Sequence, residues 1–157
     1  MGFEIKDGIL IKYTEETGVT EVTIPNNVKI IEHDAFSECK KLKGITIPGS
    51  VKRIGCDAFD NFENLISVTI QNGVKEIGCY AFSRCKNLKH ISIPDSVEII
   101  EYGAFDGCKS LEKIIIPDSV KSIGYFAFGN CENLRIINIP DGITCIECGT
   151  FYKSLCS

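Results

Sequence analysis

Apolar and polar positions follow a pattern that recurs every 23 residues along most of the chain. The pattern runs without insertion or deletion through five full units and part of a sixth. Apolar columns begin at Val28, Ile31, Phe36 and Leu42, and each continues at this 23-residue step. One unit is too small to bury its own apolar side chains, so the pattern predicts a solenoid of stacked units. The clearest column of the sequence pattern is an isoleucine that is usually followed by proline, at Ile24, Ile47, Ile70, Ile93, Ile116 and Ile139.

Each unit contains one strand-like segment, of which residues 88–94 (LKHISIP) are an example. Its β-branched residues suit a parallel ladder, and the proline ends the strand because it lacks a backbone donor. The Pro-Asp-Ser sequence at 94–96 predicts a turn. Around residues 81–85 (AFSRC) we expect a short helical turn on the far side. The predicted fold is β-rich, with parallel strands on one face and short helical turns or loops on the other.

We expect residues 1–157 to form a single domain. Residues 1–23 break the period, and residues 3–13 read as a strand, an Asp-Gly turn and a second strand. The expected organisation is therefore an N-terminal hairpin cap over 1–23, followed over 24–157 by five full repeats and a partial sixth. Ser157 falls where the repeat has leucine. The last unit is expected to fray, to pair with another molecule or to continue in a longer chain.

The repeat resembles the BspA-like family of leucine-rich repeats, most clearly from residue 88 to Pro94 and on to the Ala-Phe-Asp-Gly-Cys sequence at 104–108. The resemblance covers residues 19–153 and departs at Gln71, in place of proline, and at Phe62, in place of cysteine. It implies an α/β-type leucine-rich-repeat solenoid. Known members are bacterial and protist proteins, many at the cell surface, that bind matrix proteins or other cells. A binding or adhesion role is thus what the resemblance implies.

Composition narrows the classes of function. The net charge is −4 and no run of five basic residues occurs, which argues against a nucleic-acid partner. No apolar run approaches the roughly 20 residues of a membrane helix, so we expect no membrane insertion. The first residues carry no signal-peptide pattern. The lack of that pattern and the many cysteines favour a cytoplasmic chain. The family resemblance favours the alternative, a surface or secreted chain.

Seven of the nine cysteines fall into two columns of the repeat. Cys56 and Cys79 lie on adjacent units, which parallel strands place roughly 5 Å apart. A disulfide between them would fit an oxidising compartment, but we favour reduced thiols in a cytoplasmic or anaerobic setting. A second group is expected to pack inside the solenoid as small apolar side chains, and we call it the cysteine column: Cys39, Cys85, Cys108 and Cys131.

No constellation of residues predicts catalysis, a metal or a cofactor. Cys145 and Cys148 form a lone C-x-x-C, without the second ligand pair that a structural zinc site needs. Cys85 and His90 resemble a nucleophile and its base, but the period sends the cysteine inward and the histidine outward. His33 and His90 occupy different columns more than two units apart, so they cannot share a site.

The outward positions of the strands remain as the candidate site, because alternation turns the residues between leucine and isoleucine away from the core. We predict that they bind a protein partner, centred on His90, Lys113, Ile115 and Ile136. One alternative is that this face is merely solvated and binds no partner. A structural alternative is self-association through the open C-terminal unit. The predicted partner-binding residues are Lys43, Thr46, Ser67, Thr69, Lys89, His90, Ser92, Glu112, Lys113, Ile115, Arg135, Ile136 and Asn138.

Overall fold

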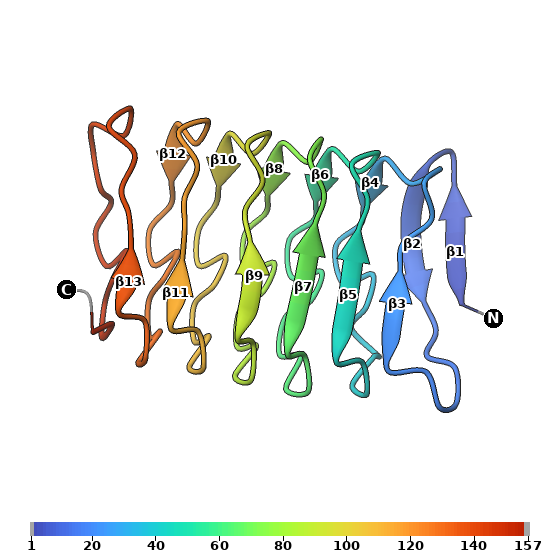
Figure 1. Cartoon of the computed structure of the whole chain (residues 1–157). Coiled ribbons are helices and arrows are strands. Elements are labelled where there is room, and N and C mark those ends of the chain that lie inside the picture. The colour runs from blue at the N-terminus through green and yellow to red at the C-terminus, as the bar shows by residue number, and fades with distance from the viewer. Residues whose placement is uncertain (1, 156–157) are drawn as a thin grey trace.

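The computed structural model describes residues 2–155 and shows a solenoid whose turns stack along one axis (Figure 1). One face carries a four-stranded parallel sheet, continued by a separate two-stranded parallel sheet. We call these two sheets together the strand face. Its strands are β3 (Glu21–Thr23), β5 (Gly44–Ile47), β7 (Ser67–Ile70), β9 (His90–Ser92), β11 (Lys113–Ile114) and β13 (Ile136–Ile137).

The register of the strand face follows the period of the sequence. Between β7 and β9, Ser67 pairs with His90 and Thr69 pairs with Ser92, so each residue lies beside its equivalent in the next unit. β11 and β13 pair in the same way. The columns seen in the sequence are therefore physical columns, and this confirms the predicted parallel stack.

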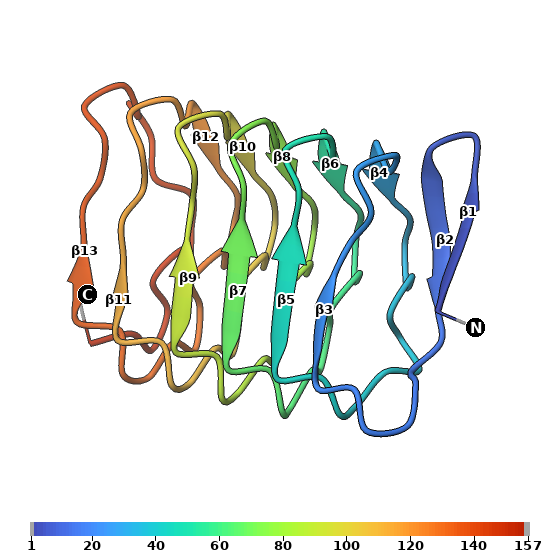
Figure 2. The same ribbon diagram turned by 45° about the vertical axis from the view of Figure 1, so that its right-hand side comes forward.

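A second sheet lies opposite the strand face, where we predicted helical turns or loops (Figure 2). Each of its repeated strands has two residues, too short for alternation to reveal in the sequence. They pair in parallel with the 23-residue register. The strands of this back sheet are β1 (Phe3–Lys6), β2 (Ile9–Tyr13), β4 (Ile30–Ile31), β6 (Arg53–Ile54), β8 (Glu76–Ile77), β10 (Ile99–Ile100) and β12 (Ser122–Ile123).

The expected helical turns are absent from the described residues, and hydrogen bonding explains why. In residues 81–85, Ser83 and Cys85 donate their N–H groups three residues back, whereas Phe82 donates to Ala104 of the next turn. Arg84 donates to the next turn as well and has a positive φ of 55°. Every second N–H thus binds a neighbouring turn, and a helical ladder cannot propagate.

The N-terminal strands β1 and β2 pair antiparallel around Asp7 and Gly8. Both turn residues have positive φ, 51° and 78°, which suits a tight hairpin turn. β2 then pairs in parallel with β4, so the hairpin lies at one edge of the back sheet (Figure 2). Within residues 1–23, β3 belongs to the strand face rather than to the hairpin.

The core between the sheets consists of the predicted columns. Phe82 lies between Phe59 and Phe105, with ring centroids 5.2 and 5.5 Å apart and nearly parallel planes. Burial of one such side chain stabilises the fold by about 1.5–3 kcal/mol. Phe62 replaces the column cysteine in its turn and packs edge-on against Phe59 at 6.0 Å. These contacts join adjacent turns, so stability depends on stacking.

The cysteine column is fully buried, as predicted. Each thiol donates to a backbone carbonyl of the preceding turn, as Cys85 does to Phe59 at 3.2 Å. Ser154 occupies the same column in the last turn and donates to Phe128 at 2.7 Å. A small side chain that can donate one hydrogen bond therefore suits this position. Burial raises the pKa of the Cys85 thiol to about 12, so it stays protonated.

The described residues contain no helix of the length and hydrophobicity that crossing a membrane requires.

Candidate partner-binding face

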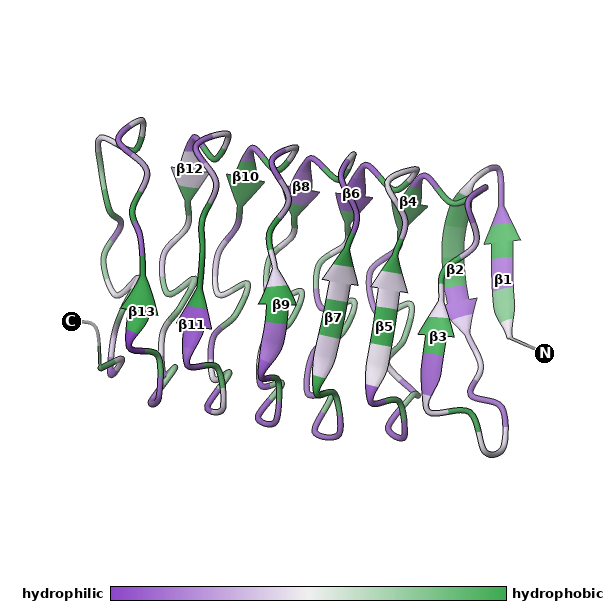
Figure 3. Cartoon of the chain, in the orientation of Figure 1, coloured by the Kyte–Doolittle hydropathy of each residue, from purple (hydrophilic) through white to green (hydrophobic). Residues whose placement is uncertain are grey.

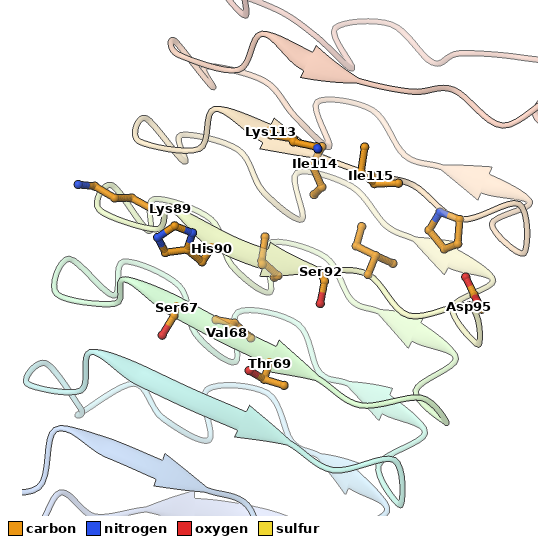
Figure 4. A pocket seen from close by; sticks show the side chains of 13 residues that line it. Ser67, Val68, Thr69, Lys89, His90, Ser92, Asp95, Lys113, Ile114 and Ile115 are labelled. Atoms are coloured by element: carbon orange, nitrogen blue, oxygen red, sulfur yellow. The ribbon is translucent and has the colours of Figure 1, made fainter.

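An open hollow of about 630 Å³ lies over β7, β9 and β11 at the middle of the strand face (Figure 4). Its walls include side chains from three successive turns: Ser67 and Thr69, then His90 and Ser92, then Lys113 and Ile115. The site thus requires stacking, because no single turn supplies more than part of the wall.

Strand alternation explains why these side chains face outward. On β9, His90 and Ser92 are exposed while Ile91 between them packs against the core. On the next turn, Ile114 is buried and its neighbours Lys113 and Ile115 are exposed. Figure 3 shows this alternation as purple and green bands along β9 and β11.

The structure places the thirteen predicted residues on this face, and all of them are exposed or half-buried. Six predicted residues lie outside the hollow. Thr46 lines a smaller neighbouring hollow over β3, β5 and β7. Asn138 has a structural contact, since its side-chain amide bonds both the N–H and the carbonyl of Ile116, at 2.8 and 2.7 Å. The predicted residues within the hollow are Ser67, Thr69, Lys89, His90, Ser92, Lys113 and Ile115.

Sequence reasoning missed Asp95 and Pro117, which line the hollow from the turns after β9 and the strand-like segment of the following unit. Both belong to the proline-containing turn that ends each strand-like segment. This loop follows the strand-like segment at a fixed place in the repeat. The repeat alignment therefore contained the signal that could have identified both residues.

The strand face carries four basic residues, all of them exposed. Among the residues described, the side chains of Lys43, Lys89, Lys113 and Arg135 make no ion pair. On the back of the solenoid, Lys75 and Lys121 both bind Glu98, and their hydrogen bonds hold the pKa of that carboxyl below its ordinary value. Lys29 on the same side makes no ion pair with any described residue.

Two exposed isoleucines accompany these cations. Ile115 is 49% exposed and Ile136 is 55% exposed, on neighbouring turns. Exposure of this extent is common for single residues. Beside Lys89, Lys113 and Arg135 and the hollow, it marks the C-terminal half of the strand face as a mixed apolar and basic surface.

The repeated parallel register and the buried leucine, isoleucine and phenylalanine columns define a leucine-rich-repeat solenoid. More particularly, the chain belongs to the BspA-type leucine-rich-repeat family, whose model matches it in six copies over residues 12–114 and 75–157. No curated protein matches the chain.

Solved structures of bacterial leucine-rich-repeat proteins are similar to the chain. A leucine-rich cell surface protein from Faecalibacterium prausnitzii is 34% identical, with a TM-score of 0.84 over 93% of this chain and 42% of that one. A leucine-rich-repeat protein from Bacteroides ovatus is 32% identical, with a TM-score of 0.82 over 99% and 43%. The Treponema pallidum leucine-rich-repeat protein is 32% identical, with a TM-score of 0.80 over 84% and 63%. This chain thus spans less than two thirds of each relative.

Within residues 2–155, the remaining cysteines lie away from the hollow. Cys145 and Cys148 are exposed free thiols. Cys56 and Cys79, also free, lie just after β6 and β8 in the back sheet. The structure brings Glu101 to the latter pair.

Proposed function

We propose that this chain is a non-catalytic interaction module that binds a protein partner through the strand face. The observation that carries the proposal is the set of unpaired cations, with Lys89 and Lys113 at the hollow and Ile115 beside them. An exposed cation without an internal partner keeps its charge available to a ligand. Exposed isoleucine adds apolar area that a partner can cover.

The partner that fits this surface presents carboxylates together with apolar side chains. Opposite charges across an interface speed association and select the partner, whereas buried apolar contacts supply most of the affinity. Recognition through such a face is consistent with the general role of leucine-rich-repeat proteins in protein interaction. A cell-surface setting is supported by the name of the Faecalibacterium prausnitzii relative.

The test replaces His90, Lys113, Ile115 and Ile136 together by alanine. A partner captured by the unaltered chain and identified should bind this variant at least about 10-fold more weakly, since hot-spot truncations cost more than about 1 kcal/mol each. Binding should also weaken as salt rises, because exposed charges are screened beyond about 8–10 Å at physiological ionic strength.

A matched control lies on the back sheet. Lys29, Ile30 and Ile99 are exposed there, with Ile30 at 38% and Ile99 at 39%. Their replacement by alanine removes similar side chains from the opposite face and should leave binding unchanged. Equal affinity of the strand-face variant and the unaltered chain, with both folded by circular dichroism, would refute the site.

A second candidate is association between copies through the last turn. Ile146 continues the column of Ile123, which is 3% exposed, yet Ile146 is 49% exposed. Leu155 is 59% exposed. Sedimentation over a dilution series tests this proposal: an unaltered chain that stays monomeric at high concentration would exclude it, and an Ile146→Lys variant should dissociate any dimer.

A further inference from the structure

A cluster of two thiols and one carboxylate lies on the back of the solenoid, apart from the hollow. It consists of Cys56, Cys79 and Glu101, and we call it the thiol–carboxylate cluster. Its three ligand atoms all lie within 4.8 Å of one another, and each residue is half-buried. It is the one group of three or more potential metal ligands among residues 2–155.

The backbone explains why two thiols meet here. Gly55 and Gly78 precede the cysteines, and a Cβ on Gly78 would lie 2.6 Å from the carbonyl oxygen of Ile54. Glycine therefore allows the two turns to approach closely just before Cys56 and Cys79. The backbone N–H of Gly78 donates a hydrogen bond to that same carbonyl oxygen at 2.9 Å, and this bond fixes the register of the two turns.

Glu101 occupies the position that glycine holds in the two preceding turns, 23 residues after Gly78. Its side chain extends back toward Cys79, where one carboxylate oxygen accepts hydrogen bonds from the backbone N–H at 3.0 Å and from the thiol at 3.3 Å. The backbone contact orients the carboxylate toward the sulfur. A hydrogen bond of this kind holds a metal ligand in position.

We propose that Cys56, Cys79 and Glu101 bind one thiophilic divalent cation, with Zn²⁺ as the expected ion. Thiolate and carboxylate are common zinc ligands, at about 2.3 Å from sulfur and about 2.0–2.2 Å from oxygen. In a tetrahedral site those lengths separate a sulfur and an oxygen ligand by about 3.5 Å. The 3.3 Å between the Cys79 sulfur and the Glu101 oxygen is close to that value.

The charges around the cluster suit a divalent cation. Two thiolates and a carboxylate around it leave one net negative charge, and the Arg53 guanidinium lies 4.0 Å from the Glu101 carboxylate. Arg53 is also bound to Glu76 at 2.8 Å, so it is held beside the cluster. His33 is not the fourth ligand, because one ring nitrogen bonds the Cys56 carbonyl and the other contacts Asp34. The fourth position is left to water.

Binding displaces protons. The two thiols give one proton each to solvent as their sulfurs bind the cation, and the carboxylate gives up its hydrogen bond from the Cys79 thiol. Burial, followed by the contact with Glu101, raises the pKa of the Cys79 thiol to about 12, so the metal-free protein keeps this proton at neutral pH. A bound cation reverses this preference, since it favours the thiolate.

The test uses the full chain with Cys145, Cys148 and Cys156 replaced by serine, reduced and freed of metal. This background retains the cysteine column, which is buried, and the thiol–carboxylate cluster. Titration with Co²⁺ should produce thiolate charge-transfer absorption that saturates at one ion per chain, and Zn²⁺ should displace it. The thermal midpoint should rise with Zn²⁺, because a ligand that binds the folded state stabilises it.

Three further variants and one control in that background separate a site from adventitious binding. Cys56→Ser and Cys79→Ser should each abolish the charge-transfer band at one equivalent. Glu101→Gln should weaken Zn²⁺ binding by about 10-fold or more, with the thiols intact. Tyr102 occupies the position of Cys79 in the next turn, and a Tyr102→Phe variant should bind Zn²⁺ as tightly as the background does. Absence of the band in the reduced background, or its survival in Cys79→Ser, would overturn the proposal.

Discussion

Replacement of Gly78 by alanine should destabilise the solenoid for a steric reason. Gly78 does not have a positive φ, so alanine can adopt its backbone conformation. The added Cβ would nevertheless lie 2.6 Å from the Ile54 carbonyl oxygen and 3.0 Å from the Gly55 carbonyl carbon. Both are backbone atoms of the preceding turn, and a rotamer change cannot relieve the contact.

The cost has two parts. The turns must separate until the closest contact exceeds 3.0 Å, below which real Cβ atoms are essentially never found. Overpacking of this kind costs about 1–3 kcal/mol. The same movement weakens the 2.9 Å hydrogen bond from Gly78 to Ile54, whose net value is about 0.5–1.5 kcal/mol. The free energy of unfolding should therefore fall by about 2–4 kcal/mol.

Gly142→Ala is the matched control, since a Cβ there meets nothing within 4 Å and the φ is not positive. It should be neutral or stabilise by about 0.4–1 kcal/mol, because alanine lowers the entropy of the unfolded chain. Urea unfolding followed by far-ultraviolet circular dichroism measures both variants. Equal midpoints for Gly78→Ala and Gly142→Ala would show that close approach of the turns is not what requires glycine.

Three other predictions concern the core, the surface ion pairs and the thiols. Phe105→Ala should lower the free energy of unfolding by about 3–5 kcal/mol in urea, as it removes a fully buried ring stacked between two others. Glu98→Gln should reduce stability at neutral pH, where the carboxylate binds Lys75 and Lys121, but not in acid. Because the pKa of Glu98 in the folded protein lies below 4.5, the stabilisation is present above pH 4.5 and is lost as the pH falls through the folded pKa. Melts of both proteins across that range should converge, and a constant difference would contradict the assignment. With a colorimetric disulfide reagent, the exposed Cys145 should react at once and the cysteine column only after unfolding; rapid modification of all thiols in the native protein would disprove its burial.

The inward half of the structure was predictable because it repeats. Each core column recurs at a fixed step, so its members had to lie side by side once the chain formed a solenoid. The burial of the cysteine column was predicted from that step together with the small, apolar character of the cysteine side chain. The outward direction of His90 and Lys113 followed from strand alternation.

The back of the solenoid was predicted less well. A strand as short as Ile30–Ile31 has no alternation to detect, and residues 81–85 contain residues that a helix tolerates. What decides their conformation is the competition for backbone N–H groups between one turn and the next, as at Phe82. That competition exists only after stacking, so one unit taken alone does not contain it.

Glu101 shows why the repeat can conceal a site as well as reveal the fold. A search for metal ligands along the sequence looks for short spacings such as that of Cys145 and Cys148, whereas ligands in a solenoid are brought together across turns, nearly a full period apart. Aligned by column, Glu101 follows two glycines, Gly55 and Gly78, and sits beside the column of the two cysteines. The hollow on the strand face is built by the same rule, from substitutions at equivalent positions of three adjacent turns. In this architecture a binding site is a departure from the repeat shared by neighbouring turns, because the repeat itself is committed to the core.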